Sequence, residues 1–148
     1  MKIRNAVAQD KPRCRQLLDL LNNSGGCAAD KVFEDLLDHA RGQVIVAEHE
    51  GSVIGMASVS YNVAMRYGGE YCQLEELIVD PEARGLNAGG ALVAATLDNA
   101  NARRCAEYGL YLVASTEHNQ AFYEKYGLKK VGSEMRFRYE IKLSVTNW

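Results

Sequence analysis

The chain has 148 residues, of which 47% are hydrophobic and 24% charged, and its formal net charge at pH 7 is −2. This length and balance predict one globular domain, residues 1–148, and the weak negative charge gives no reason to expect nucleic acid as a partner. Because no apolar run approaches the ~20 residues of a membrane helix and the N-terminus lacks the apolar stretch of a signal peptide, neither a membrane partner nor export is expected.

The cysteine and histidine pattern argues against a metal site. The three histidines are scattered, and the four cysteines form no C-x-x-C pair and fit no zinc-binding spacing. We therefore expect no metal and a reduced, cytoplasmic protein. The cysteines are Cys14, Cys27, Cys72 and Cys105.

The first 42 residues predict one strand followed by two helices. Residues 2–6 form the strand, and a helix begins after Asp10, whose side chain is expected to cap free N–H groups. Asp30 is expected to cap the second helix, and Gly42 to end it in the left-handed conformation. The helices carry apolar residues at helical spacing, which predicts one buried face for each.

The middle of the chain predicts strands. Residues 43–61 alternate as two antiparallel strands that a tight turn at Glu50–Gly51 joins. Residues 61–70 suggest an irregular connection, and residues 71–80 predict a strand that becomes apolar toward its end.

The last third of the chain returns to alternating elements. A helix is expected over residues 86–103, a central strand over 108–115 and a helix over 119–127, which a glycine closes. Two strands over 128–143 complete the pattern, and one apolar face of the second is expected to pack in the core. The order predicts a mixed α/β fold around one sheet.

The stretch VDPEARGLNAGGALV, residues 79–93, joins a strand to a helix through glycines and one arginine. A helix N-terminus leaves N–H groups unpaired and carries partial positive charge, and glycines let an anion approach it closely. The G-K-[ST] ending of a P-loop and the G-x-G-x-x-G dinucleotide pattern are both missing. A phosphate cradle and a plain strand-to-helix turn therefore both remain open at this point.

Two neighbouring motifs point to a family. LEELIVDPEARG (residues 74–85) and AFYEKYGL (residues 121–128) resemble the fourth strand, the pyrophosphate loop and the later helix of the GNAT superfamily of acyl-CoA-dependent N-acyltransferases. The resemblance covers nearly the whole chain in element order. It implies a single-domain α/β (α+β) fold with a mixed, mostly antiparallel central sheet flanked by helices.

The resemblance also implies how acetyl-CoA, the expected co-substrate, would bind. Backbone groups of one strand would contact the pantetheine arm, although a plainly buried strand explains the same residues, and the loop amides with one arginine would hold the pyrophosphate. Asn87 stands where the family usually has glycine, and Thr116 where it usually has asparagine. Asn tolerates a positive φ well, so the loop is still expected to form. The implied positions are Leu77, Ile78, Val79, Arg84, Gly85, Leu86, Asn87, Ala88, Gly89, Gly90 and Thr116.

Two catalytic roles follow from the same motifs. Tyr123 falls on the family tyrosine that protonates the departing thiolate, and an ordinary packed aromatic is the alternative. Glu75 resembles the base proposed in polyamine acetyltransferases, and it is preferred over Glu76 or an ordered water; two solvated or salt-bridged glutamates without a catalytic role are the alternative. Because side chains alternate along a strand, Glu75 and Glu76 are expected on opposite faces.

The resemblance leaves the acceptor open within one class, a primary amine of a small molecule or a peptide. The segments expected to surround it carry no acidic cluster, which favours an acceptor of modest charge. The expected activity is acetyl transfer from acetyl-CoA by direct attack. The alternative is a non-catalytic acyl-CoA-binding or sensory module, and a homodimer formed through the C-terminal elements is also considered.

Overall fold

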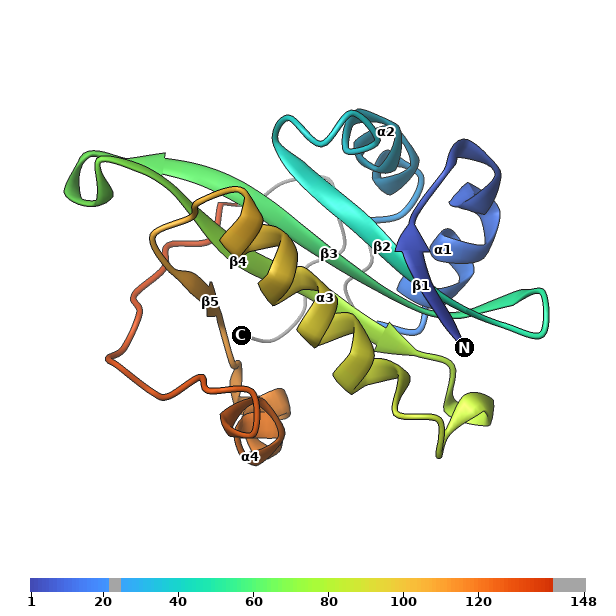
Figure 1. Ribbon diagram of the computed structural model, residues 1–148. Helices are drawn as coiled ribbons and strands as arrows, with labels where there is room; N and C mark the ends of the chain where they lie inside the picture. Colours follow the sequence, from blue (N-terminus) through green and yellow to red (C-terminus); the bar gives the residue numbers. More distant parts are fainter. Residues whose placement is uncertain (22–24, 140–148) are drawn as a thin grey trace.

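The computed structural model describes residues 1–21 and 25–139 of the chain. Its sheet has the strand order β1-β2-β3-β4-β5, in which the first four strands are antiparallel to their neighbours and β5 is parallel to β4 (Figure 1). This arrangement confirms the expected mixed, mostly antiparallel sheet. The strands are β1 (Lys2–Asn5), β2 (Gly42–His49), β3 (Ser52–Ala64), β4 (Gly69–Val79) and β5 (Tyr108–Leu110).

Helices cover both faces of this sheet. Helices α1 and α2 lie on one face, and α3 crosses the other, where it connects β4 to β5 (Figure 1). Helix α4 lies beyond the end of β5 and contacts the first turn of α3. The helices are α1 (Lys11–Leu18), α2 (Ala28–Asp35), α3 (Ala88–Ala102) and α4 (Gln120–Glu124).

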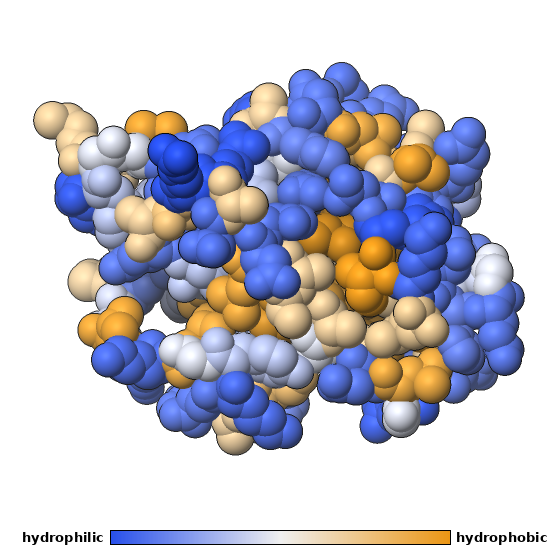
Figure 2. All heavy atoms as spheres, in the orientation of Figure 1, coloured by the Kyte–Doolittle hydropathy of each residue, from blue (hydrophilic) through white to orange (hydrophobic). Residues whose placement is uncertain are grey.

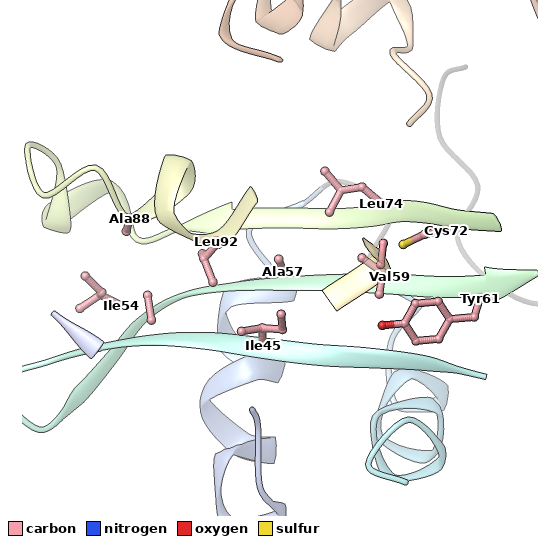
Figure 3. Close-up of a cluster of buried hydrophobic side chains, with 11 residues drawn as sticks. Ile45, Ile54, Ala57, Val59, Tyr61, Cys72, Leu74, Ala88 and Leu92 are labelled. Carbon is pink, nitrogen blue, oxygen red and sulfur yellow. The ribbon is translucent and has the colours of Figure 1, made fainter. Parts of the chain in front are cut away.

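Strand alternation divides the core into two clusters. Ala57 and Val59 of β3 point toward α3, where Leu92 is fully buried against them (Figure 3). Met56 of β3 points the other way and packs with Phe33 of α2. Successive side chains of a strand face opposite sides, so one sheet supports both helical layers. No helix in residues 1–21 and 25–139 has the length and apolarity to cross a membrane.

The expected helix boundaries differ from those observed for a common reason, which is tertiary contact. The Asp10 carboxylate does not cap α1; it accepts hydrogen bonds from the Arg4 guanidinium at 2.7 and 2.9 Å and from the Val7 N–H. Helix α2 already begins at Ala28 and ends at Asp35, so Asp30 lies inside its first turn. Gly42 begins β2, where a Cβ would overlap the Val59 carbonyl oxygen.

The segment over residues 61–70 was expected to be irregular, but most of it is strand. Strand β3 continues to Ala64 and β4 begins at Gly69, so the two form a long hairpin. The short 3₁₀ turn Met65–Tyr67 joins them, and Gly68 follows in the left-handed region with φ of 65°. Cross-strand pairing along the whole hairpin overrides the weak local signal of this segment.

The C-terminal expectations are not met in the described residues. Strand β5 spans three residues rather than eight, and residues 128–139 form no strand; residues 140–143 lie outside the described part. Met135 and Phe137 are 97% and 79% exposed, which contradicts core packing of this face. In the space-filling view an opening remains between the chain that follows β5 and the sheet, while apolar side chains gather over α3 (Figure 2). The alternation of apolar residues was therefore not enough to predict a strand here, because a strand also needs a neighbouring strand to pair with.

We expect Leu92→Ala to lower the free energy of unfolding by about 2–5 kcal/mol, because it leaves a cavity in the cluster beneath α3. Leu20→Ala removes the same atoms at a position that is 55% exposed and should cost far less. Urea unfolding followed by circular dichroism measures both. Equal losses would contradict the assignment of Leu92 to the core.

Candidate active site

The site is organised by a β-bulge in β4. Ser58 of β3 pairs with Glu76, and the next residue, Val59, pairs with Leu74, so Glu75 is an extra residue on β4. The Glu76 carboxylate accepts a hydrogen bond from the Ser58 hydroxyl at 2.7 Å, and the Glu75 carboxylate accepts one from Ser60 at 2.5 Å. Ser58 and Ser60 are two residues apart and share a face. Both carboxylates therefore lie on one face, and the expectation of opposite faces is wrong.

Beneath these carboxylates is a cavity of about 470 Å³. It lies between the sheet and the layer formed by α1 and α2, and Glu75 and Glu76 both line it. Its remaining wall is largely apolar and includes Leu18 of α1, Phe33 of α2 and Met56 of β3. A concave apolar site with a few convergent polar groups is typical of small-molecule binding.

The two carboxylates differ in their surroundings. Glu75 is exposed, whereas Glu76 is half-buried. Burial raises the pKa of Glu76 above its usual value, the Ser58 hydrogen bond opposes that rise, and the negative charge of Glu75 adds to it. A carboxylate with a raised pKa at a cavity wall suits proton transfer.

The edge of β4 beyond the bulge faces an opening in the sheet. Strand β5 pairs with β4 only at Cys72, Gln73 and Leu74, and then the two strands diverge. Leu77, Ile78 and Val79 remain paired with β3 on their other side. Within the described residues their backbone groups on the β5 side have no strand partner. Ile78 packs against the α1–α2 layer, while Leu77 and Val79 pack toward α3, so the buried-strand interpretation also holds.

The loop between β4 and α3 has the backbone that an anion cradle needs. Gly85 has φ of 88° and Asn87 has φ of 54°, and α3 begins directly after Asn87 at Ala88. The first-turn amides of this 15-residue helix thus lie at the end of a left-handed turn. Arg84 is exposed beside them. Asn87 occupies the conformation that its glycine counterpart would adopt.

The start of this loop is tied to α1. Asp80 accepts a hydrogen bond from the Glu82 N–H at 2.9 Å and one from the Arg13 guanidinium at 2.6 Å. Arg13 also donates to the Val53 carbonyl oxygen. The helix beside the cavity and the loop before α3 are therefore held in one arrangement.

The two glycines of α3 serve a role that the sequence did not reveal. A Cβ at Gly90 would overlap the Tyr126 hydroxyl, and one at Gly89 would lie 3.7 Å from the Phe122 ring. Aromatic side chains of α4 and of the turn that follows it therefore pack directly on the first turn of α3. Glycine makes this close approach feasible in addition to freeing amides.

Tyr123 lies on the α3 side of the sheet. It packs against the cluster beneath α3 and is half-buried, and burial raises its pKa above the usual value for tyrosine. Glu75 and Glu76 lie on the opposite face. Tyr123 and the two glutamates can therefore approach one reacting group only across the free edge of β4.

Thr116 lies in the 3₁₀ turn Ala114–Asn119, and its hydroxyl donates to the Val113 carbonyl oxygen at 3.2 Å. Tyr61, which flanks the segment expected near the acceptor, is buried under α3 and donates to Gln43 instead. Sequence reasoning missed the two serines, although serine at alternate positions of an otherwise apolar strand was an available signal. Among the described residues, no group of three or more His, Cys, Asp or Glu side chains could hold a metal ion.

The sequence matches the acetyltransferase (GNAT) family over residues 11–128. This match covers most of the chain and includes the bulged strand, the cradle loop and Tyr123. The protein therefore belongs to the GNAT acetyltransferase family. A search of curated proteins found no match.

Solved structures share the fold. An acetyltransferase of Trypanosoma brucei has a TM-score of 0.79 and 24% identity, covering 93% of this chain and 99% of its own. Glucosamine-6-phosphate N-acetyltransferase of Arabidopsis thaliana has a TM-score of 0.79 and 25% identity, covering 94% and 98%. Ribosomal-protein-alanine N-acetyltransferase of Brucella melitensis has a TM-score of 0.77 and 19% identity, covering 94% and 100%.

The contact between α4 and α3 predicts different effects for neighbouring glycines. Gly90→Ala should lower the free energy of unfolding by about 1–3 kcal/mol, because its methyl group would overlap the Tyr126 hydroxyl and would also lie too close to the Asn87 side chain. Gly89→Ala has room for a methyl group and should be tolerated.

Thermal and urea unfolding without any added cofactor measure both variants. Adding Tyr126→Phe to Gly90→Ala should recover part of the loss, because the overlapping oxygen is gone. Equal stability of the two glycine variants would contradict this packing role.

Proposed function

We propose that this protein is an acetyl-CoA-dependent N-acetyltransferase that acts on a primary amine of a small molecule or peptide. The observation that supports this proposal most directly is the bulge, which places two carboxylates over a cavity next to the free edge of β4. Family membership supports acyl transfer. The printed names of two similar structures concern different acceptors, an amino-sugar phosphate and a ribosomal-protein alanine, so they do not choose the acceptor here.

The chain's features fit acetyl-CoA as the acetyl donor. The backbone of Leu77, Ile78 and Val79 would bind the pantetheine arm as an added strand along the free edge. Arg84 and the amides of residues 85–90 would bind the pyrophosphate at the N-terminus of α3. Thr116 is the proposed side-chain contact to the arm. When bound, acetyl-CoA supplies an activated acetyl thioester.

The acceptor amine must lose a proton before it can attack. An alkylammonium with a pKa near that of lysine, about 10.4, is neutral about once in a thousand molecules near pH 7, so a base is required. Glu75 and Glu76 form the proposed base. The pKa of Glu76 is raised by burial and, to a smaller extent, by the charge of Glu75, so Glu76 is suited to take up the proton of the amine. Glu75 is exposed and therefore passes the proton on to solvent.

Transfer is proposed to be direct, with no acyl-enzyme. Cys14 lines the cavity, but burial raises the pKa of its thiol to about 12, so it stays protonated and is a poor nucleophile. The amine forms the new bond to the acetyl carbonyl carbon, and the carbon–sulfur bond then breaks. Tyr123 donates its proton to the departing thiolate, and its raised pKa keeps it protonated at neutral pH.

Binding of CoA should raise the melting temperature, because the ligand binds only the folded chain. Arg84→Gln should weaken binding by about two- to sixfold at low salt, since an exposed charge pair contributes up to about 1 kcal/mol. Arg41→Gln changes an exposed arginine before β2 and serves as the control. Calorimetric titration measures the affinities. An unchanged melting curve at millimolar CoA would contradict the cradle.

The catalytic roles predict two distinct pH profiles. Tyr123→Phe keeps the ring, so CoA should still bind while kcat falls by about 10- to 1,000-fold at every pH. Glu75→Gln and Glu76→Gln should each lower kcat/KM most at low pH, and both should recover at high pH as the amine becomes neutral. In the unchanged protein, kcat/KM should rise with pH through the raised pKa of Glu76, because the base must be ionised.

The double variant should lose less than the product of the single losses, because the pair acts as one unit. Thiol release measures the four variants and the unchanged protein. Normal turnover by Tyr123→Phe would show that Tyr123 is not the general acid and only packs in the core. Binding of CoA without transfer to any amine would favour the alternative, a non-catalytic acyl-CoA-binding or sensory module.

A further inference from the structure

The cavity under Glu75 and Glu76 also carries information about the acceptor. We propose that the acceptor is a small amine with one positive charge and an apolar aliphatic or aromatic body. This inference rests on the proposed N-acetyltransferase function and narrows its substrate. It follows from what lines the cavity beyond the two carboxylates.

The wall away from the carboxylates is largely apolar, although Lys11, Arg15 and Asp30 also line it. Leu18 and Leu21 contribute from α1 and the turn that follows it, and Val32, Phe33 and Leu36 contribute from α2 and its end. Val32 is 54% exposed and Leu21 40%, although both are large and apolar. An apolar ligand group would remove this surface from water, which is favourable in proportion to the area buried.

Among the described residues, the charges that line the cavity leave one cation-binding position. Asp30 is paired with Arg15 at 3.4 Å, and Lys11 is paired with Glu34 at 2.7 Å. Glu75 and Glu76 are instead held by serine hydroxyls, which are neutral. One ammonium group at this pair therefore meets complementary charge.

A second charge on the ligand would be unfavourable. The remaining carboxylate of the lining, Asp30, is already paired with Arg15, and a second ammonium group on the apolar surface of Val32, Phe33 or Leu36 would have no partner, which is costly. A phosphate group would be repelled by the two carboxylates, while the cavity's cations already have partners. These arguments disfavour polyamines and amino-sugar phosphates. The volume of about 470 Å³ is within the usual range for a small molecule.

A matched pair of acceptors tests the charge requirement. Hexylamine and 1,6-diaminohexane have the same length and differ in the second ammonium. We expect kcat/KM for thiol release to be at least about tenfold higher with hexylamine. From propylamine to hexylamine, kcat/KM should rise about two- to fourfold per methylene. Spermidine, glucosamine 6-phosphate and an alanyl-phenylalanine amide complete the panel.

A variant moves the specificity if the apolar wall sets it. Val32→Asp places a carboxylate on that wall, so the preference for hexylamine over 1,6-diaminohexane should shrink by about tenfold or more. Leu20→Asp is the matched control, because Leu20 is 55% exposed, close to the value for Val32, and does not line the cavity. It should keep the wild-type ratio. Melting curves confirm that both variants fold.

The outcomes separate this inference from the function on which it rests. If the diamine, spermidine, the amino-sugar phosphate or the peptide is the best acceptor, the inference is wrong while N-acetyl transfer stands. An unchanged ratio in Val32→Asp also overturns it. If CoA binds but no amine in the panel is acetylated, the proposed function itself fails, and the inference fails with it.

Discussion

One extra residue in β4 determines the geometry of the candidate active site. Without Glu75 as a bulge, strand alternation would send one of the two carboxylates into the layer beneath α3. The bulge keeps Leu74 and Val59 paired in that core and still turns both glutamates toward the cavity. Packing on one face and chemistry on the other are thereby compatible in a single strand.

A second constraint is the divergence of β4 and β5. The strands pair over three residues, and beyond that the edge of β4 has no strand partner among the described residues. Glu75 and Glu76 lie on one face of the sheet, and Tyr123 packs on the other. The opening is the place where both can reach the same group. A fully paired sheet would separate them by its own thickness.

Polar side chains hold these parts in register across the molecule. Arg13 joins α1 to Asp80 and to the backbone of β3, which links the cavity wall to the cradle loop. At the other end of α3, Arg103 binds Glu70 at 2.8 Å and donates to the carbonyl oxygens of His39 and Ala40. Helix α3, which carries the proposed anion cradle, is therefore anchored at both ends to the layer that carries the proposed acceptor cavity.

The sequence by itself determined the order of elements as far as the helix that ends before Gly127, the Glu50–Gly51 hairpin, the glycine-containing turn before α3 and the family, because these depend on local periodicity, turn residues and short motifs. It did not reveal the bulge at Glu75, since an inserted residue is defined only by the register of the neighbouring strand. Nor did it show that aromatic rings of α4 and of the turn after it pack against Gly89 and Gly90, because that contact joins distant segments. The apolar alternation near Met135 predicted a strand, yet no partner strand pairs with residues 128–139 in the described part of the chain. Tertiary structure decided these points because pairing and close packing depend on residues far away along the chain.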